Sequence, residues 1–309
     1  MSSEDCTGIP DNTDITGLGV RLAFYLQVVV SLFVAYYRNQ VSDASYWTML
    51  ITTFALFVSG LVLHTAQSLS LFHAIIIALL LNLHTRAVFL SASPTPFVRA
   101  RGMDAGAAFL SILAMSPRDQ LRRLAFMRIK DMPSGLIAAI WGVFVWSKPS
   151  TFGTPTNCND KIVVAFLWWK ASATGVGRAL CLTVSVFQTL IYTVGIYRCI
   201  RFYIWDAFAD DSETNLPEHW VKPFLRQGFM GGWWDRFWLA APFGILIAVT
   251  ELTIKDNRSL IIDQSAENTW TLGQIFPLVM VGVPLVDVVK AFWERHMMSC
   301  LDSASSSSF

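Results

Sequence analysis

The strongest constraint on this chain is a series of apolar blocks, each long enough to cross the hydrocarbon core of a membrane as a helix, which takes roughly 20 residues. The block at 74–81 reads AIIIALLL and lacks the apolar–polar alternation of a membrane β-strand. Charged residues make up only 15% of the chain, whereas a soluble domain carries about a quarter. Because backbone polar groups in lipid must be satisfied within their own segment, we expect an all-α, polytopic transmembrane helix bundle.

We predict about seven membrane-spanning helices, and an eighth is possible. The doubtful segment is 161–173, which is apolar but interrupted by Lys170. It fits a re-entrant piece, an interfacial helix or part of a long bent fifth span. The seven predicted spans are 17–37, 46–65, 69–90, 134–147, 177–197, 237–254 and 270–291.

The distribution of basic residues indicates the orientation. Lys and Arg gather in the connections after the third and fifth spans and in the C-terminal segment, whereas the residues before the first span contain neither. The positive-inside rule then places the C-terminus in the cytoplasm and the N-terminus outside, in the lumen of the endoplasmic reticulum or another endomembrane. A glycosylation sequon at Asn257 falls on the predicted outside and agrees with this orientation.

The chain divides into three predicted parts. Residues 1–16 form an extramembrane leader without the basic start of a cleaved signal peptide. Residues 17–297 form a single transmembrane helical domain, and the Ser-rich residues 298–309 form a disordered tail. Within the domain, 106–130 reads either as a basic amphipathic helix on the membrane surface or as a solvated connector. The Trp-rich segment 216–238 reads as an interfacial belt or as a loop folded under the bundle.

Cysteines and sequence motifs exclude several classes of site. Cys6 and Cys158 both fall outside under this topology, so an oxidising lumen would allow a disulfide between them, although pairing cannot be read from sequence. No CxxC pair, P-loop, HExxH, GxSxG or GxGxxG pattern occurs. A DxxD spacing appears once, ending at Asp14, and reads as a solvated acidic stretch. We therefore expect no metal and no cofactor, and the net charge of +1 predicts no nucleic-acid partner.

Polar side chains inside the predicted spans are the candidate functional residues, because each one costs free energy there. Arg21 and Glu251 are the natural ion pair, since either would otherwise be an uncompensated charge. Tyr25 and Gln27 lie one to two turns below Arg21. Taken singly, such residues also fit structural pairs or end residues that reach outward. Together they predict a polar pocket open to the outer side, and the residues that share this layer are Arg21, His64, His73, Glu251 and Gln274.

A second polar group is predicted deeper in the membrane. It contains Asn82, His84 and Arg86 in the third span and Asp287 in the seventh. A purely structural interpretation, in which Asp287 pairs with Arg86 and fixes two helices, explains the group equally well.

Two short stretches resemble a fungal group of multi-pass membrane proteins, which is similar to the membrane-bound terpene cyclases of meroterpenoid pathways such as ascochlorin and ascofuranone biosynthesis. The resemblance rests on DITGLGVR at 14–21 with FYLQ at 24–27, and on ENTWTLGQ at 267–274, about a tenth of the chain. It implies cyclisation of an epoxidised farnesyl chain on an aromatic polyketide, without diphosphate or magnesium. Besides Asp14, the matching positions are the candidate substrate-binding residues Arg21, Tyr25, Gln27, Trp270 and Gln274.

Cyclisation of this kind needs a proton donor, an apolar cavity and a terminal base. Glu251 is the first candidate acid and Asp14 the second. If Arg21 pairs with Glu251, Asp14 or Asp287 becomes the better donor. His64 or His73 would accept the final proton. The expected partners are a hydrophobic prenylated small molecule and the lipid bilayer.

Two other function classes remain open. A small-molecule or ion transporter would show a continuous polar path through the bundle. A receptor or scaffold without enzymatic activity also fits seven spans with an external N-terminus.

Overall fold

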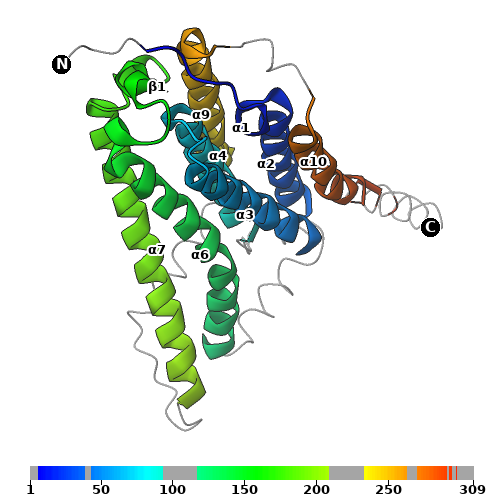
Figure 1. Cartoon of the computed structure of the whole chain (residues 1–309). Helices are drawn as coiled ribbons and strands as arrows, with labels where there is room; N and C mark the ends of the chain where they lie inside the picture. Colours follow the sequence, from blue (N-terminus) through cyan, green and yellow to red (C-terminus); the bar gives the residue numbers. More distant parts are fainter. Residues whose placement is uncertain are drawn as a thin grey trace.

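The computed structural model describes residues 6–38, 43–92, 117–208, 233–262, 270–290, 292, 293 and 297. Within these residues the protein is a bundle of long helices with one small β-hairpin (Figure 1). Five helical stretches are long and apolar enough to cross a membrane, and they are Thr13–Phe33, Ser45–Thr65, Leu71–Val88, Val176–Arg201 and Gly273–Lys290. The expectation of a mostly helical chain with apolar helices of membrane-spanning length is therefore confirmed.

The helical elements follow the predicted apolar blocks closely at the start of the chain and extend beyond them later. The long helices are α2 (Leu18–Arg38), α3 (Asp43–Thr65), α4 (Leu71–Ala92), α6 (Pro117–Ser147), α7 (Val176–Phe208) and α9 (Trp233–Asn257). The shorter ones are α1 (Thr13–Thr16), α10 (Leu272–Met280) and the 3-10 turns η2 (Pro149–Thr151), η3 (Thr156–Lys161) and η4 (Arg258–Leu260). Residues 282–290 continue as helix after α10.

The predicted fourth and sixth spans lie within longer helices. The block 134–147 falls in α6, where Met132–Ser147 is a shorter apolar stretch, and 237–254 falls in α9. Helix α6 runs without a break from 117 through Pro133, so the predicted amphipathic helix and the fourth span are one element where the structure describes them. The parts of these predictions at 106–116 and 216–232, and the predicted tail 298–309, lie outside the described residues.

The segment 161–173 forms a β-hairpin, and the two helical interpretations of it were wrong. Strand β1 (Val163–Phe166) pairs antiparallel with β2 (Trp169–Ser172), with Phe166 opposite Trp169. Leu167 adopts a left-handed backbone conformation (φ 51°) in the turn between them. Val and Phe favour strands, and the left-handed backbone at Leu167 reverses the chain, so the segment does not continue as a helix. Lys170, which interrupts the apolar run, pairs with Asp256 at 2.7 Å.

Four segments from distant parts of the sequence meet at one end of the bundle, called here the capped end. A disulfide joins Cys6 to Cys158, which is the pairing that the sequence left open. Ile9 forms a parallel bridge with Ile261 after α9, and Ser70 before α4 bridges to Gly153 after α6. In Figure 1 the hairpin lies beside the N-terminal segment at this end. Segments predicted to lie on one side of the membrane are thus together.

Asn257 is a structural residue of the capped end. Its amide is fully buried, donates to the carbonyl groups of Val163 and Thr253 at 2.6 and 2.7 Å, and accepts from the Val163 N–H at 2.9 Å. The folded protein therefore leaves no room for a glycan here. The sequon does not support the predicted orientation, because its side chain serves to hold β1 against α9.

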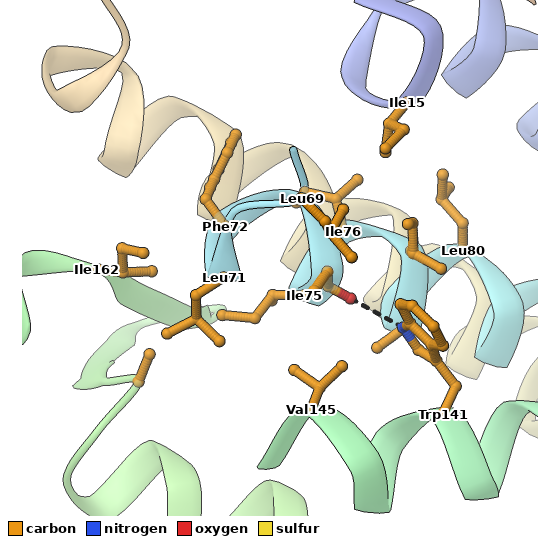
Figure 2. Close-up of a cluster of buried hydrophobic side chains, with 14 of the residues drawn as sticks. Ile15, Leu69, Leu71, Phe72, Ile75, Ile76, Leu80, Trp141, Val145 and Ile162 are labelled. Atoms are coloured by element: carbon orange, nitrogen blue, oxygen red, sulfur yellow. Dashed lines mark hydrogen bonds between the residues drawn. The ribbon is translucent and has the colours of Figure 1, made fainter. Parts of the chain in front are cut away.

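Helix α4 lies at the centre of the bundle, and Figure 2 shows the side chains around it. Ile75, Ile76 and Leu80 are fully buried. The indole N–H of Trp141 on α6 donates to the Ala74 carbonyl at 3.1 Å. Such a bond gives a buried indole the partner it needs and fixes the distance between α4 and α6. Gly60 on α3 makes room for this ring, since a Cβ there would lie 2.7 Å from it.

Candidate functional site

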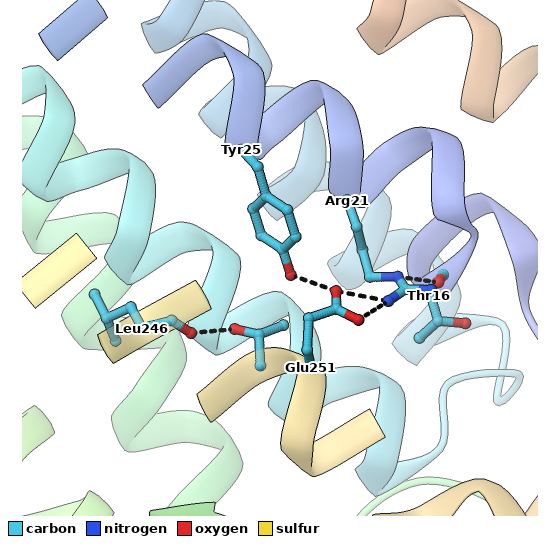
Figure 3. Close-up of polar contacts among 6 residues, drawn as sticks. Thr16, Arg21, Tyr25, Leu246 and Glu251 are labelled. Carbon is cyan, nitrogen blue, oxygen red and sulfur yellow. Dashed lines mark hydrogen bonds and ion pairs between the residues drawn. The ribbon is translucent and has the colours of Figure 1, made fainter. Parts of the chain in front are cut away.

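An ion pair joins α2 to α9 near the capped end, as the sequence predicted. The Arg21 Nη1 atom lies 2.6 and 2.5 Å from the two carboxylate oxygens of Glu251. The Tyr25 hydroxyl donates to the same carboxylate at 2.8 Å. Figure 3 shows Arg21 and Tyr25 reaching from one face of α2 toward Glu251. The carboxylate is thus held by a guanidinium and a phenol that lie one helical turn apart.

The break between α1 and α2 helps to orient this ion pair. Gly17 ends α1 with an extended backbone, and the Thr16 carbonyl just before it accepts a bond from Arg21 Nε at 2.8 Å. The guanidinium is therefore fixed from two directions. Its side chain is 7% exposed, whereas the Glu251 side chain is 44% exposed. The site is closed around Arg21 and open on the side of Glu251.

The other positions of the two resembling stretches join the first helices to the last one. Gln274 Oε1 accepts the Gly19 N–H at 3.1 Å, and a Cβ on Gly19 would lie 2.8 Å from the Gln274 Cβ. Asp14 is exposed and accepts a bond from the Thr271 hydroxyl at 2.6 Å. Trp270 is mostly exposed beside Gly19. Because Gly19 has no side chain, α2 and α10 approach closely at this point. The contacts of Asp14, Trp270 and Gln274 therefore pack the first helices against the last one.

The two histidines of the predicted outer layer make their contacts elsewhere. His64, in the last turn of α3, stacks on Phe152 and meets Phe144 edge-on, with ring centroids 5.1 and 4.9 Å away. His73 is buried in the first turn of α4, where its Nδ1 lies 2.6 Å from the Ser70 hydroxyl that also caps the helix. The contacts of the five layer residues therefore fall into separate groups around Arg21, Gln274, His64 and His73.

A buried row of polar contacts follows one face of α3 in the other half of the bundle. Ser45 donates to the Asp287 carboxylate, the Ser31 hydroxyl donates to the Met49 sulfur at 3.1 Å, and Thr53 contacts His84 Nδ1 at 3.1 Å. The three α3 residues are spaced by four, which places them on one helix face. Each reaches a different helix. We call this row the α3 seam, and its members are Ser45, Met49, Thr53, Asp287, Ser31 and His84.

The α3 seam was predicted only in part. Asp287 and His84 belonged to the predicted inner group, with Arg86 as the suggested partner of Asp287, whereas the structure places Ser45 against this carboxylate. Ser45 and Thr53 were missed as site residues. Their spacing of eight in an apolar helix is the signal that could have found them. Their partners depend on how the helices are rotated, which apolar content does not specify.

Among the described residues, no group of three or more His, Cys, Asp or Glu side chains could hold a metal ion. Comparison of the chain with protein-family models, curated proteins and solved structures finds no match. The function must therefore be argued from the geometry of the Arg21–Glu251 pair and the α3 seam.

Proposed function

We propose that this protein is an integral membrane terpene cyclase that isomerises an epoxidised prenyl chain. The observation that carries the proposal is the α3 seam, which has a carboxyl group at one end and an imidazole at the other within an apolar bundle. The resemblance of 14–27 and 267–274 to the fungal group supports the same activity. Acid and base at separate ends are the two groups that such a cascade needs.

The reaction begins when an acid donates a proton to the epoxide oxygen. The C–O bond breaks, its electron pair stays on the oxygen as a hydroxyl group, and the alkenes of the chain attack the resulting cation in turn. Loss of a proton from the carbon beside the last cation forms a new alkene, and a base accepts that proton. Substrate and product have the same mass, so no cofactor is consumed.

Asp287 is the proposed acid. Glu251 is ion-paired with Arg21 and so has its charge already engaged, which removes the first candidate. Asp14 is exposed at the capped end, whereas Asp287 is only 5% exposed. Water would capture a carbocation, so the acid must work where water is excluded. This requirement favours Asp287.

The surroundings of the α3 seam suit an isoprenoid chain. From Ser45 to Thr53 the helix rises about 12 Å, at about 1.5 Å per residue. Val28, Tyr46 and Leu83 are buried together beside this stretch, and Phe24 lies against His84. Their aromatic rings would stabilise the cations of the cascade through cation–π attraction. The Arg21–Tyr25–Glu251 cluster would bind the polar aromatic head of the substrate nearer to the capped end.

The proposal includes an endomembrane location with seven spans, of which α6 and α9 supply the fourth and sixth. The capped end would then face the lumen and the C-terminus the cytoplasm. The gathering of four segments at the capped end supports this alternation. A single cysteine in place of Trp168, which is 91% exposed in the hairpin turn, would be labelled by an impermeant reagent only from the lumenal side.

The deciding experiment supplies a farnesylated aromatic epoxide to membranes that contain the full chain and looks for an isomer of equal mass by chromatography and mass spectrometry. We expect Asp287→Asn to reduce product at least about 100-fold, the usual contribution of an acid. Asp14→Asn and the control Asp256→Asn, at a carboxylate that pairs with Lys170 of the hairpin, should retain activity. Glu251→Gln should weaken substrate binding more than turnover. Full product from well-expressed Asp287→Asn would overturn the assignment of the acid.

A small-molecule transporter is the second candidate. The observation in its favour is that polar groups lie both at the capped end, around Arg21, and along the α3 seam. A transporter would move solute into liposomes and produce no isomer. Flux by wild-type protein, lost in Asp287→Asn, together with an absence of isomer formation, would replace the cyclase with this function.

A further inference from the structure

Two fully buried polar side chains near the α3 seam have atoms without a hydrogen-bond partner among the described residues. Both amide atoms of Gln27 and the Nε2 atom of His84 are in this position. Leaving a buried polar atom unsatisfied is unfavourable, and an apolar side chain of similar shape would be neutral or stabilising. Buried polar groups in proteins are nearly always paired with protein or with ordered water, so these atoms mark a place where a polar ligand or a water molecule can bind.

The two side chains belong to the same helix interface. The ring centroids of Phe24 and His84 lie 4.3 Å apart, which fixes the level at which α2 meets α4. Gln27 follows Phe24 by three residues, on the same face of α2 and about 4.5 Å further along the axis. The next residue, Val28, is buried in one cluster with Leu83 and Ala87, the neighbours of His84. Gln27 and His84 therefore lie within about one helical turn of each other along the bundle axis.

The contacts of Thr53 determine the tautomer of His84. The Thr53 hydroxyl donates its one proton to the Met49 carbonyl at 2.8 Å, because a carbonyl can only accept. Its contact with His84 Nδ1 at 3.1 Å must then have Nδ1–H as the donor. In the neutral ring this leaves Nε2 with a lone pair. The interface thus presents an acceptor from His84, together with the donor and the acceptor of the Gln27 amide.

We propose that Gln27 and His84 bind the hydroxyl group of an isoprenoid alcohol inside the bundle. The hydroxyl proton is donated to His84 Nε2, and the hydroxyl oxygen accepts from the Gln27 amide. Phe24, Val28 and Leu83 surround this site with apolar surface that suits the chain. The choice of an isoprenoid rests on the proposed function, whose substrate is a prenyl chain, whereas the choice of a hydroxyl rests on the acceptor of His84 and the donor of Gln27. Binding, however, is measured without turnover.

The test compares two probes of equal chain length, tritiated farnesol and tritiated farnesene, on the purified full chain in nanodiscs. Farnesene lacks the oxygen. Wild-type protein should prefer farnesol by about four- to 100-fold, because each of the two hydrogen bonds contributes about two- to tenfold to affinity. Gln27→Met and His84→Phe should each reduce this preference toward one while leaving farnesene binding unchanged.

A thermal melt separates a binding role from a structural one. Gln27→Met replaces an unsatisfied polar group by an apolar one, so its unfolding temperature should equal or exceed that of wild type, whereas His84→Phe also loses the bond from Nδ1 to Thr53 and should unfold at a slightly lower temperature. Asn82→Leu is the matched control, because the Asn82 amide, two residues from His84, bonds to the Ala78 carbonyl of its own helix. It should keep the farnesol preference.

Three results would overturn this site: wild type that does not distinguish the two probes, variants that keep the preference, or a preference lost equally in Asn82→Leu. If the protein prefers farnesol over farnesene but forms no cyclised product, the binding site at Gln27 and His84 is supported and the proposed cyclase activity is not.

Discussion

Helices α4 and α7 are almost equally apolar, but their surroundings are opposite. In their membrane-length stretches, 83% of the α4 residues are buried and only 6% of those in α7. Large side chains such as Phe187, Leu190 and Tyr197 are more than half exposed on α7. Water would not tolerate an apolar face of this length, whereas lipid solvates it. Hydropathy therefore identifies helices that are long and apolar enough to cross a membrane, but it does not distinguish a helix enclosed by protein from one with an exposed apolar face.

The polar side chains of the two helices show the same difference. On α4, His84 contacts Thr53 of α3, and Thr85 donates to the Ser134 carbonyl of α6. On α7, the hydroxyl groups donate back to carbonyls of their own helix four residues earlier, at Thr183, Ser185 and Thr189. A polar group that faces lipid must be satisfied within its helix. Among these residues Thr183 is exposed whereas Ser185 is buried, and Asn82 on α4 also bonds within its own helix. The bonds of His84 and Thr85 to neighbouring helices are therefore what marks α4 as the central helix.

The largest expected effect comes from removing core volume on α4. Ile76→Ala should lower the free energy of unfolding by about 2–5 kcal/mol, because Ile76 is fully enclosed and leaves a cavity. Leu190→Ala, on the outward face of α7, should change it by less than about 0.5 kcal/mol. Thermal unfolding of both variants in detergent measures the difference. Equal losses would mean that α7 is covered by protein and that the comparison fails.

The next largest effect should come from removing the disulfide between Cys6, in the N-terminal segment, and Cys158, which precedes α7. Replacing Cys6 and Cys158 together by serine should lower stability by about 2–4 kcal/mol, because the bond closes a loop across a sequence separation of 152. Cys181→Ala, at a free cysteine on α7, serves as the control. Unfolding temperatures with and without a reducing agent measure the loss. Wild type that melts at the same temperature in both conditions would contradict it.

A charge on the outward face of α7 should have a slightly smaller effect. Phe187→Arg near the middle of the helix should cost about 2–3 kcal/mol of membrane insertion, since an arginine there must leave the lipid or draw water in. Trp168→Arg in the exposed hairpin turn should cost nothing. The fraction of each variant that resists carbonate extraction from membranes measures insertion. Complete insertion of Phe187→Arg would show that this face does not meet lipid.

Much of the fold could be predicted from the sequence because apolar length is a local property. The predicted spans 17–37 and 69–90 agree with α2 and α4 to within two residues at each end. The hairpin at 163–172 could not be predicted in this way, since a short apolar run with Trp and Val fits a strand or a buried helix. Helix α7 extends to Phe208, beyond the predicted end at 197, because the apolar residues of this stretch continue as helix past the charges of Arg198, Arg201 and Asp206 that set the predicted boundary.

The candidate site was also predictable only in part. The Arg21–Glu251 pair was predictable, because two lone charges at one depth in a membrane require each other. The partner of Asp287 was not, since Ser45 stands at the edge of a span and meets it only through the rotation of α3. The free atoms of Gln27 and His84 could not be predicted either, because an unsatisfied contact becomes visible only once every neighbour is placed.

The ion pair that closes the bundle also sets a condition on its synthesis. Arg21 leaves the ribosome 230 residues before Glu251, and Gly19 waits even longer for Gln274. During that interval the positive charge of Arg21 has no carboxylate partner. The face of α2 that carries Gly19 also lacks α10, the helix that packs against it. In a chain that enters a membrane as it is made, which the proposed function implies, the charge of Arg21 must therefore be balanced by the insertion machinery or by lipid headgroups until Glu251 has been translated.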